Sequence, residues 1–408
     1  MELNTRLATA TSTEPPRAPA PELGISQIDP RPGMVELGPG FLDASLVPAT
    51  LMARCTAQAL QRWPAQATGY GANAGPFGLR GYLSGRPGAT AAKSAAMAAW
   101  CGPDNVMTTA GTSATLSTLA MRFAREGRTV LTEAPTYNFA TMILATRGVR
   151  TIPVPGPLDD IDTKELRKAA ERAARDDGLP PALYVIPTFH NPTGRVISAA
   201  RRAEILALAA DLGMVVVEDQ AYSDLSYSGA VPPALCEITP DPDLVITLYT
   251  FAKCLAPGLR LGWLVTGERL VSELAGDPLR LSGGGASHFV ATAVDVACRT
   301  GSLQERAVWL RPQLKLRHDV LHAGLTASLP PGFRLGPVRG GFFMWLSLPP
   351  GISESALLRE AEARGVSFLC GSAFSAASPG IRLCFAAQPP AALEAGASRL
   401  ADACLALS

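Results

Sequence analysis

The sequence predicts an α/β fold with a mainly parallel sheet that helices cover on both faces. From about residue 100, short apolar segments alternate with longer segments of helical period. Parallel strands need such helical crossovers, which lie on the faces of the sheet. After Arg299 the pattern changes to one long amphipathic helix, followed by an antiparallel-looking pair of strands. The 408 residues are also too many for one small core, so we expect a large domain and a smaller α+β domain.

The chain is expected to divide into four segments. Residues 1–28 form a leader rich in Pro and Ala, which has too little apolar surface to order itself. Residues 29–62 are assigned to the small domain, residues 63–300 to the large domain and residues 301–408 to the C-terminal part of the small domain.

Individual elements follow from the hydrophobic period. The apolar segments read as strands are 128–131, 182–186, 214–217, 244–248 and 263–265, with an antiparallel pair at 342–348 and 381–385. The segments of helical period are 163–176, 198–212 and 302–325.

Composition excludes several classes of partner. A formal net charge of +1 gives no electrostatic footprint for nucleic acid or anionic lipid, so we expect a small-molecule substrate. The eight cysteines have no spacing typical of a metal site or a disulfide framework, which favours a reduced, cytoplasmic setting and no metal. No apolar run is long enough to span a bilayer, and the N-terminus does not resemble a signal peptide.

Lys253 is the most informative residue. It follows the apolar strand 244–248, with Thr250 three residues before it and Arg260 seven residues after it. Burial beside another cation lowers the pKa of an amine, which makes the neutral nucleophile available near neutral pH. The pattern indicates a Schiff-base lysine beside a phosphate-binding arginine, and therefore pyridoxal 5'-phosphate (PLP). The alternative is an ordinary surface lysine in a salt bridge.

Polar residues also follow the other predicted strands, where ligands of α/β sheets collect. Tyr137 could stack on a planar cofactor, and Asn191, in an Asn-Pro-Thr-Gly turn, could hydrogen-bond a phenolate oxygen. Asp219 ends a strand, where a buried carboxylate needs a partner such as a protonated pyridine nitrogen, unless it caps a helix. Thr112 and Ser113 precede a helix expected from about Thr115, so they suit a phosphate or serve as an ordinary cap.

Together these segments resemble the fold type I, class I/II PLP-dependent aminotransferases. The resemblance is closest to the branch of 2-aminoadipate and aromatic aminotransferases and of the C-terminal domain of MocR-type regulators. It spans about residues 35–387 and includes Tyr70 to Arg80, Gly340-Gly341-Phe342 and Ile381-Arg382-Leu383. The resemblance implies a mainly parallel sheet of the seven-stranded type, a smaller α+β domain, and a homodimer with shared active sites.

The resemblance also implies a role for each candidate residue. Lys253 would form the internal aldimine and then move a proton at the substrate α-carbon, while Asp219 would keep the pyridine nitrogen protonated. The remaining assignments are Asn191 and Tyr222 on the phenolic oxygen, Tyr137 on the ring face, Thr112, Ser113, Thr250, Arg260 and the partner's Tyr70 on the phosphate, and Arg382, Asn191 and Gly40 on the substrate carboxylate.

The sequence departs from the family pattern at positions that bear on the substrate. Ala252 stands where a serine is common, and Thr112-Ser113-Ala114 replaces a frequent pair of glutamines. The segment Gly38 to Leu42 differs from the usual proline-containing stretch. A loop at Gly283 to Gly285 is unusually rich in glycine and leads to His288, which is either an extra acid/base or a loop or interface histidine.

Three functions follow as hypotheses. The first is an aminotransferase that exchanges an amino group between an L-amino acid and a 2-oxo acid. The second is a PLP enzyme of specialised biosynthesis on the same scaffold, with elimination, γ-replacement, cyclisation or amino-acid oxidation as its outcome. The third is a MocR-type regulator, which we disfavour because only the short Pro-rich leader precedes the enzyme-like region.

Overall fold

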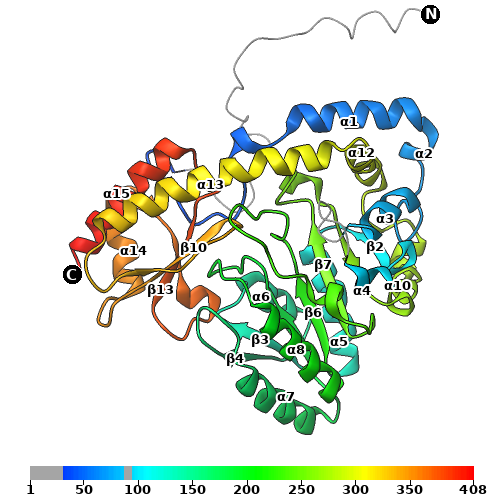
Figure 1. The fold of residues 1–408 in the computed structure, drawn as a ribbon, viewed down its shortest axis with the longest axis horizontal. Coiled ribbons are helices and arrows are strands. Elements are labelled where there is room, and N and C mark those ends of the chain that lie inside the picture. Colours follow the sequence, from blue (N-terminus) through cyan, green and yellow to red (C-terminus); the bar gives the residue numbers. More distant parts are fainter. Residues whose placement is uncertain (1–30, 87–93) are drawn as a thin grey trace, which may run out of the picture.

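A seven-stranded sheet forms the centre of the larger part of the molecule (Figure 1). The computed structural model describes residues 31–86 and 94–408, so the predicted leader lies outside the described residues. The strand order is β2-β8-β7-β6-β5-β3-β4. The bounds are β2 Val106–Thr109, β3 Val130–Ala134, β4 Thr151–Pro155, β5 Ala182–Val185, β6 Val215–Asp219, β7 Val245–Thr250 and β8 Gly262–Val265. Strands β7, β6, β5, β3 and β4 are parallel and β8 is antiparallel to its neighbours, which confirms the predicted mainly parallel α/β fold.

The sequence did not predict β2 and β4. Strand β4 lies at the edge of the sheet and contains Pro153 and Pro155, residues that argue against a strand. An edge strand tolerates proline because one side of its backbone needs no partner. Strand β2 is four residues long and half of it is threonine, so its sequence contains no distinct apolar run.

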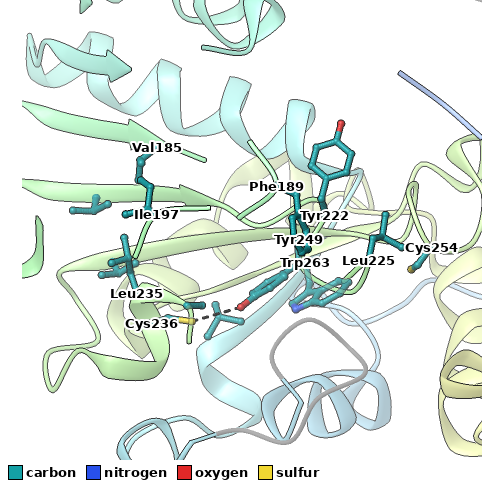
Figure 2. Packing of buried hydrophobic residues seen from close by; sticks show 14 of the residues in the cluster. Val185, Phe189, Ile197, Tyr222, Leu225, Leu235, Cys236, Tyr249, Cys254 and Trp263 are labelled. Atoms are coloured by element: carbon teal, nitrogen blue, oxygen red, sulfur yellow. Dashed lines mark hydrogen bonds between the residues drawn. The ribbon is translucent and has the colours of Figure 1, made fainter. Parts of the chain in front are cut away.

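Helices cover both faces of the sheet, as predicted. Helices α7 (Thr163–Asp177) and α8 (Ala199–Leu212) pack on one face, and α5 (Thr112–Glu126), α6 (Asn138–Thr146) and α10 (Glu268–Ala275) pack on the other. Asp162 caps α7 by accepting hydrogen bonds from the backbone of Lys164 and Glu165, and Gly178 ends this helix at φ 71°. Figure 2 shows part of the core cluster to which α8 contributes, where Tyr249 stacks against Trp263.

A second, antiparallel sheet lies beside the main one, in the order β12-β13-β10-β9. Its strands are β9 Arg334–Leu335, β10 Phe343–Ser347, β12 Leu369–Cys370 and β13 Gly380–Cys384, and it packs with α14 Glu354–Ala363 and α15 Pro390–Leu405. The predicted pair corresponds to β10 and β13. Strand β1 (Val35–Glu36) pairs with β11 (Val366–Ser367), so the early segment lies with the C-terminal part. The exact domain boundaries stay predictions.

Helix α13 (Ser302–Ser328) connects the two parts. Leu303, Leu310 and Leu314 lie in the core of the main sheet, whereas Leu321 and Leu325 lie in the core of the smaller one.

The remaining helical segments are η2 Ala44–Leu46, α1 Ala49–Arg62, α2 Pro64–Thr68, α3 Phe77–Ser84, α4 Ala95–Ala98, η3 Pro103–Asn105, α9 Leu235–Ile238, η4 Pro257–Leu259, α11 Pro278–Leu281, α12 His288–Arg299 and η5 Gly371–Phe374. Among the described residues, no helix is both long and apolar enough to cross a membrane.

Candidate active site

A cavity of about 980 Å³ opens at the carboxyl ends of the parallel strands, next to the smaller sheet. It gathers all but one of the candidate residues predicted from the sequence. The cavity lining includes Gly40, Thr112, Ser113, Tyr137, Asn191, Asp219, Tyr222, Thr250, Lys253, Arg260 and Arg382. The exception is Tyr70, which lies in a different hollow.

Lys253 follows the end of β7 and faces this cavity. Its Nζ donates a hydrogen bond to the carbonyl oxygen of Gly40 at 2.7 Å. Burial lowers the pKa of Lys253 to about 8, and the positive charges of Arg382 and Arg260 act in the same direction. With this pKa, about half of the Lys253 side chains are neutral amines at pH 8 and about a tenth at pH 7.

Asp219 is the last residue of β6, and only 5% of its surface is exposed. Its Oδ1 accepts a hydrogen bond from the backbone N–H of Ala221 at 3.1 Å, and its Oδ2 accepts one from the Tyr184 hydroxyl at 2.9 Å. Burial raises the pKa of Asp219 to about 6, although both hydrogen bonds oppose this shift. Asp219 ends a strand inside the cavity and does not cap a helix of its own. The sequence had not singled out Tyr184.

Hydroxyl groups and an arginine surround the first turn of α5. Helix α5 begins at Thr112, three residues earlier than expected, so Thr112 and Ser113 lie in its first turn. The preceding Gly111 has φ 95°, a conformation that glycine adopts easily and that lets the chain turn directly from β2 into the helix. Arg260 Nη2 donates to the carbonyl oxygen of Ala110 at 3.4 Å. A helix N-terminus with hydroxyls and a guanidinium suits a phosphate group.

Arg382 lies on β13 and lines the same cavity, with 4% of its surface exposed. Its Nη1 donates to Asn191 Oδ1 at 2.9 Å and its Nη2 donates to the carbonyl oxygen of Gly38. The guanidinium packs over the rings of Phe343 and Phe374, at 4.2 and 4.9 Å from their centroids. In the described part of the chain, Arg382 Nε has no hydrogen-bond partner.

Two tyrosines complete the cavity. Tyr222 is buried against Phe342 and Phe343 in edge-to-face contacts, with ring centroids 5.3 and 5.5 Å apart. Burial raises the pKa of both Tyr222 and Tyr137, so each hydroxyl stays protonated at neutral pH.

Tyr70 and His288 lie together in a separate hollow of about 440 Å³. Tyr70 is 92% exposed and its ring lies close to Gly283, where a side chain would collide with it. His288 begins α12, and its Nε2 lies 2.9 Å from the carbonyl oxygen of Gln66. Neither residue lines the cavity of Lys253 within the described chain.

A buried ionic cluster that sequence reasoning missed supports the segment carrying Asn191. Glu133 forms an ion pair with Arg195, accepts a hydrogen bond from the backbone N–H of Ile186 at 2.8 Å, and lies 3.4 Å from His190 Nε2. Burial lowers the pKa of His190 to about 4, and Arg195 acts in the same direction, so His190 is neutral. The sequence shows three separate ionisable residues, one in β3 and two in the segment after β5, and only the fold shows that they meet.

Comparison with known proteins agrees with this geometry. Residues 74–400 match the family model described as aminotransferase class I and II. Aromatic-amino-acid aminotransferase 1 from Thermococcus litoralis is 27% identical over 382 residues, which cover 90% of this chain and 87% of the relative. The uncharacterized HTH-type transcriptional regulator YdfD from Bacillus subtilis is 26% identical over 354 residues, which cover 86% of this chain and 70% of the regulator.

A solved structure has the same fold. The crystal structure of LysN, an α-aminoadipate aminotransferase from Thermus thermophilus complexed with N-(5'-phosphopyridoxyl)-L-leucine, superposes with a TM-score of 0.80. It is 27% identical, and the match covers 92% of this chain and 93% of that one. These matches confirm the predicted resemblance, including its regulator branch.

Proposed function

The chain belongs to the aminotransferase class I and II family, and we propose that the cavity around Lys253 is where this family's reaction takes place. The protein is a PLP-dependent aminotransferase that exchanges an amino group between an amino acid and a 2-oxo acid. The observation that carries the proposed site is the meeting of Lys253, Asp219 and Arg382 in one cavity, although they come from separate parts of the sequence.

The cavity fits PLP and an amino acid group by group. The phosphate matches the start of α5, with Thr112, Ser113, Thr250 and Arg260, and the ring nitrogen matches the buried acceptor Asp219. The free Nε of Arg382 is a buried donor that needs an acceptor, which a substrate carboxylate would supply. We assign Asn191 and Tyr222 to the phenolic oxygen, Tyr137 to the ring face, and Asn191 and Gly40 to the carboxylate as well.

The chemistry follows from what each side chain can do. When bound, PLP supplies an aldehyde that condenses with amines and a ring that withdraws electrons from the substrate α-carbon. Lys253, whose pKa is lowered to about 8, supplies the neutral amine and then moves the proton at the α-carbon. Arg382 and Asn191 orient the substrate carboxylate, and Asp219 holds a proton on the ring nitrogen.

The experiment is a single half-reaction. Protein loaded with PLP is mixed with phenylalanine, tyrosine or 2-aminoadipate, substrates suggested by the names of the relatives, with no acceptor present. We expect one equivalent of pyridoxamine phosphate and of the matching 2-oxo acid, and recovery of PLP when a 2-oxo acid is added. Lys168→Ala, which changes an exposed lysine of α7, should behave like the wild type, and Lys253→Ala should not react.

Release of ammonia without an acceptor would contradict amino transfer. That result would instead favour the elimination, γ-replacement, cyclisation or oxidation outcomes, for which the comparisons give no support.

We also propose that the protein is a homodimer, in which Tyr70 of each subunit reaches the phosphate site of the other. The 92% exposure of Tyr70 in its own chain supports this proposal, as do exposed apolar side chains nearby, including Phe77, Leu279 and Phe289. A monomer of full activity in analytical ultracentrifugation would contradict it. Seven of the eight cysteines (Cys55, Cys236, Cys254, Cys298, Cys370, Cys384 and Cys404) are free thiols, which supports a reduced, cytoplasmic location.

A further inference from the structure

We propose that Tyr184 is a positioning residue for the cofactor, whose hydroxyl holds the Asp219 carboxylate and sets how strongly that carboxylate draws the proton of the ring nitrogen. The inference rests on the proposed function, because it concerns the way Asp219 meets PLP. Tyr184 is not one of the described residues that line the cavity, so it acts only through Asp219.

The register of two neighbouring strands places the two side chains in line. Tyr184 on β5 pairs with Val217 on β6, and Asp219 follows two residues later on the same face of the sheet. Two residues of a parallel strand advance about 6.6 Å. The phenol ring of Tyr184 spans this distance, and its hydroxyl donates to Asp219 Oδ2 at 2.9 Å.

The hydroxyl can act only as a donor toward Asp219. Tyr184 is completely buried, and burial raises its pKa well above the usual range, so the proton stays on the phenol. The other carboxylate oxygen accepts from the backbone N–H of Ala221 at 3.1 Å. These two donors fix the plane of the carboxylate, and an ionised carboxylate still has lone pairs for a third donor on its cavity side.

The hydrogen bond also tunes the basicity of Asp219. Burial makes the carboxylate more basic, whereas a donated hydrogen bond stabilises its anionic form. Without the Tyr184 hydroxyl, Asp219 would bind a proton more strongly and would be held by one donor instead of two. Either change moves the shared proton away from the ring nitrogen and weakens the electron withdrawal on which the reaction depends.

The test compares two variants that each remove one buried hydroxyl from the main sheet. Tyr184→Phe removes the donor to Asp219. The matched control is Tyr249→Phe on β7, whose hydroxyl lies 3.6 Å from the sulfur of Cys236 and on the α8 side of the sheet (Figure 2). Each protein is loaded with PLP labelled with ¹⁵N in its ring, and three quantities are measured: the ¹⁵N chemical shift of the ring nitrogen, the dissociation constant of PLP, and KM for the amino acid.

We expect Tyr184→Phe to move the ¹⁵N signal toward that of an unprotonated pyridine. The PLP dissociation constant should rise by up to about tenfold, because Asp219 held by one donor makes a weaker contact with the ring. KM for the amino acid should stay within about twofold of wild type, because the contacts of Arg382 with Asn191 and Gly38 remain. Tyr249→Phe should leave the ¹⁵N signal and the dissociation constant unchanged.

A double-mutant cycle separates positioning from a general packing effect. In an Asp219→Asn background, Tyr184→Phe should no longer change the dissociation constant, because the two residues act as one unit. Equal ¹⁵N signals in Tyr184→Phe and wild type, or an undiminished effect in the Asp219→Asn background, would overturn the inference while the proposed function stands. A wild-type protein that takes up no PLP would contradict the proposed function, and the inference with it.

Discussion

Two cationic side chains of the cavity have opposite requirements. In the proposed site, Lys253 must lose its proton to become a nucleophile, whereas Arg382 must stay charged to bind a carboxylate. The same burial serves both, since a lysine amine loses its proton readily in a desolvated site and a guanidinium does not. A lysine as nucleophile and an arginine as carboxylate-binding group therefore both suit this buried cavity.

The lowered pKa of Lys253 predicts how PLP capture depends on pH. Because the pKa is about 8, the amine is protonated below that value and neutral above it. The rate constant for PLP capture by the apoprotein should rise about tenfold per pH unit below pH 8 and level off above it. Stopped-flow absorbance of apoprotein mixed with PLP measures this rate. A rate that continued to rise up to the ordinary lysine pKa would contradict the placement of Lys253.

Arg382→Lys tests the carboxylate site. Lysine keeps the charge but lacks the planar fork, so it cannot bind a carboxylate in a bidentate manner and leaves Asn191 without its donor. We expect kcat/KM for the amino acid to fall about 100-fold, mainly through KM, with PLP affinity unchanged. Arg334→Lys, on the exposed strand β9, is the matched control. Loss of PLP binding in Arg382→Lys would show that the residue has another role.

Gly40, Tyr222 and Arg382 were assigned through the family resemblance, whereas sequence reasoning found Lys253, Asp219 and Asn191 because each stands at or shortly after the end of an apolar strand. It missed Tyr184 for the opposite reason. This residue lies within β5 and reaches Asp219 only through the register of β5 and β6, which the sequence does not reveal. Tyr70 could be placed only by resemblance, because its neighbours in the proposed dimer belong to another chain.

At the scale of elements, the segment after β5 depends on the buried cluster of Glu133, His190 and Arg195. Burial opposes ionisation of Glu133, but Arg195, His190 and the backbone N–H of Ile186 together outweigh it, and the pKa of Glu133 is lowered. The ion pair links β3 to the turn that holds Asn191, which in turn contacts Arg382. The cluster therefore connects the stability of the sheet to the geometry of the carboxylate site.

Arg195→Met tests this connection. The variant leaves Glu133 buried without its cation, so we expect the free energy of unfolding to fall by about 3 to 5 kcal/mol and KM for the amino acid to rise. Arg150→Met, which breaks an exposed pair with Asp177, should cost less than about 1 kcal/mol. Denaturant unfolding at neutral pH measures both. The loss of unfolding free energy in Arg195→Met, relative to the wild type, should shrink as the pH falls through the lowered pKa of Glu133. The reason is that the protonated carboxyl needs no partner.

Some helices and strands could be predicted from the sequence and others could not, for physical reasons. The helices α7, α8 and α13 have clear periods and were predicted within a few residues at each end. Strand β4 was missed because its prolines contradict local strand preference, and only its position at the sheet edge makes them acceptable. The start of α5 was placed three residues late because the positive φ of Gly111 cannot be read from the sequence.

At the scale of the whole molecule, the proposed dimer gives Tyr70 a function that its own chain does not. The two candidate hollows of one chain would then belong to different active sites, one holding Lys253 and the other presenting Tyr70. The separation of Tyr70 and His288 from the Lys253 cavity also means that any contribution of His288 to catalysis would have to be made across the subunit interface.

Mixing two inactive variants tests this arrangement. Lys253→Ala and Tyr70→Ala chains, unfolded and refolded together, should form dimers in which one site has both Lys253 and the partner's Tyr70. Random assortment predicts about one quarter of wild-type activity. The control mixture of Lys253→Ala with Asp219→Asn should stay inactive, because both residues belong to the same site. Absence of activity in the first mixture would contradict a shared site.

Covalent trapping tests most directly whether Lys253 is the residue that holds PLP. The protein loaded with PLP is reduced with borohydride, digested and analysed by mass spectrometry. We predict one equivalent of phosphopyridoxyl label on Lys253, none on the exposed Lys168, and no label in Lys253→Ala. A label on another lysine, or a Lys253→Ala protein that still retains a reducible cofactor, would contradict the account.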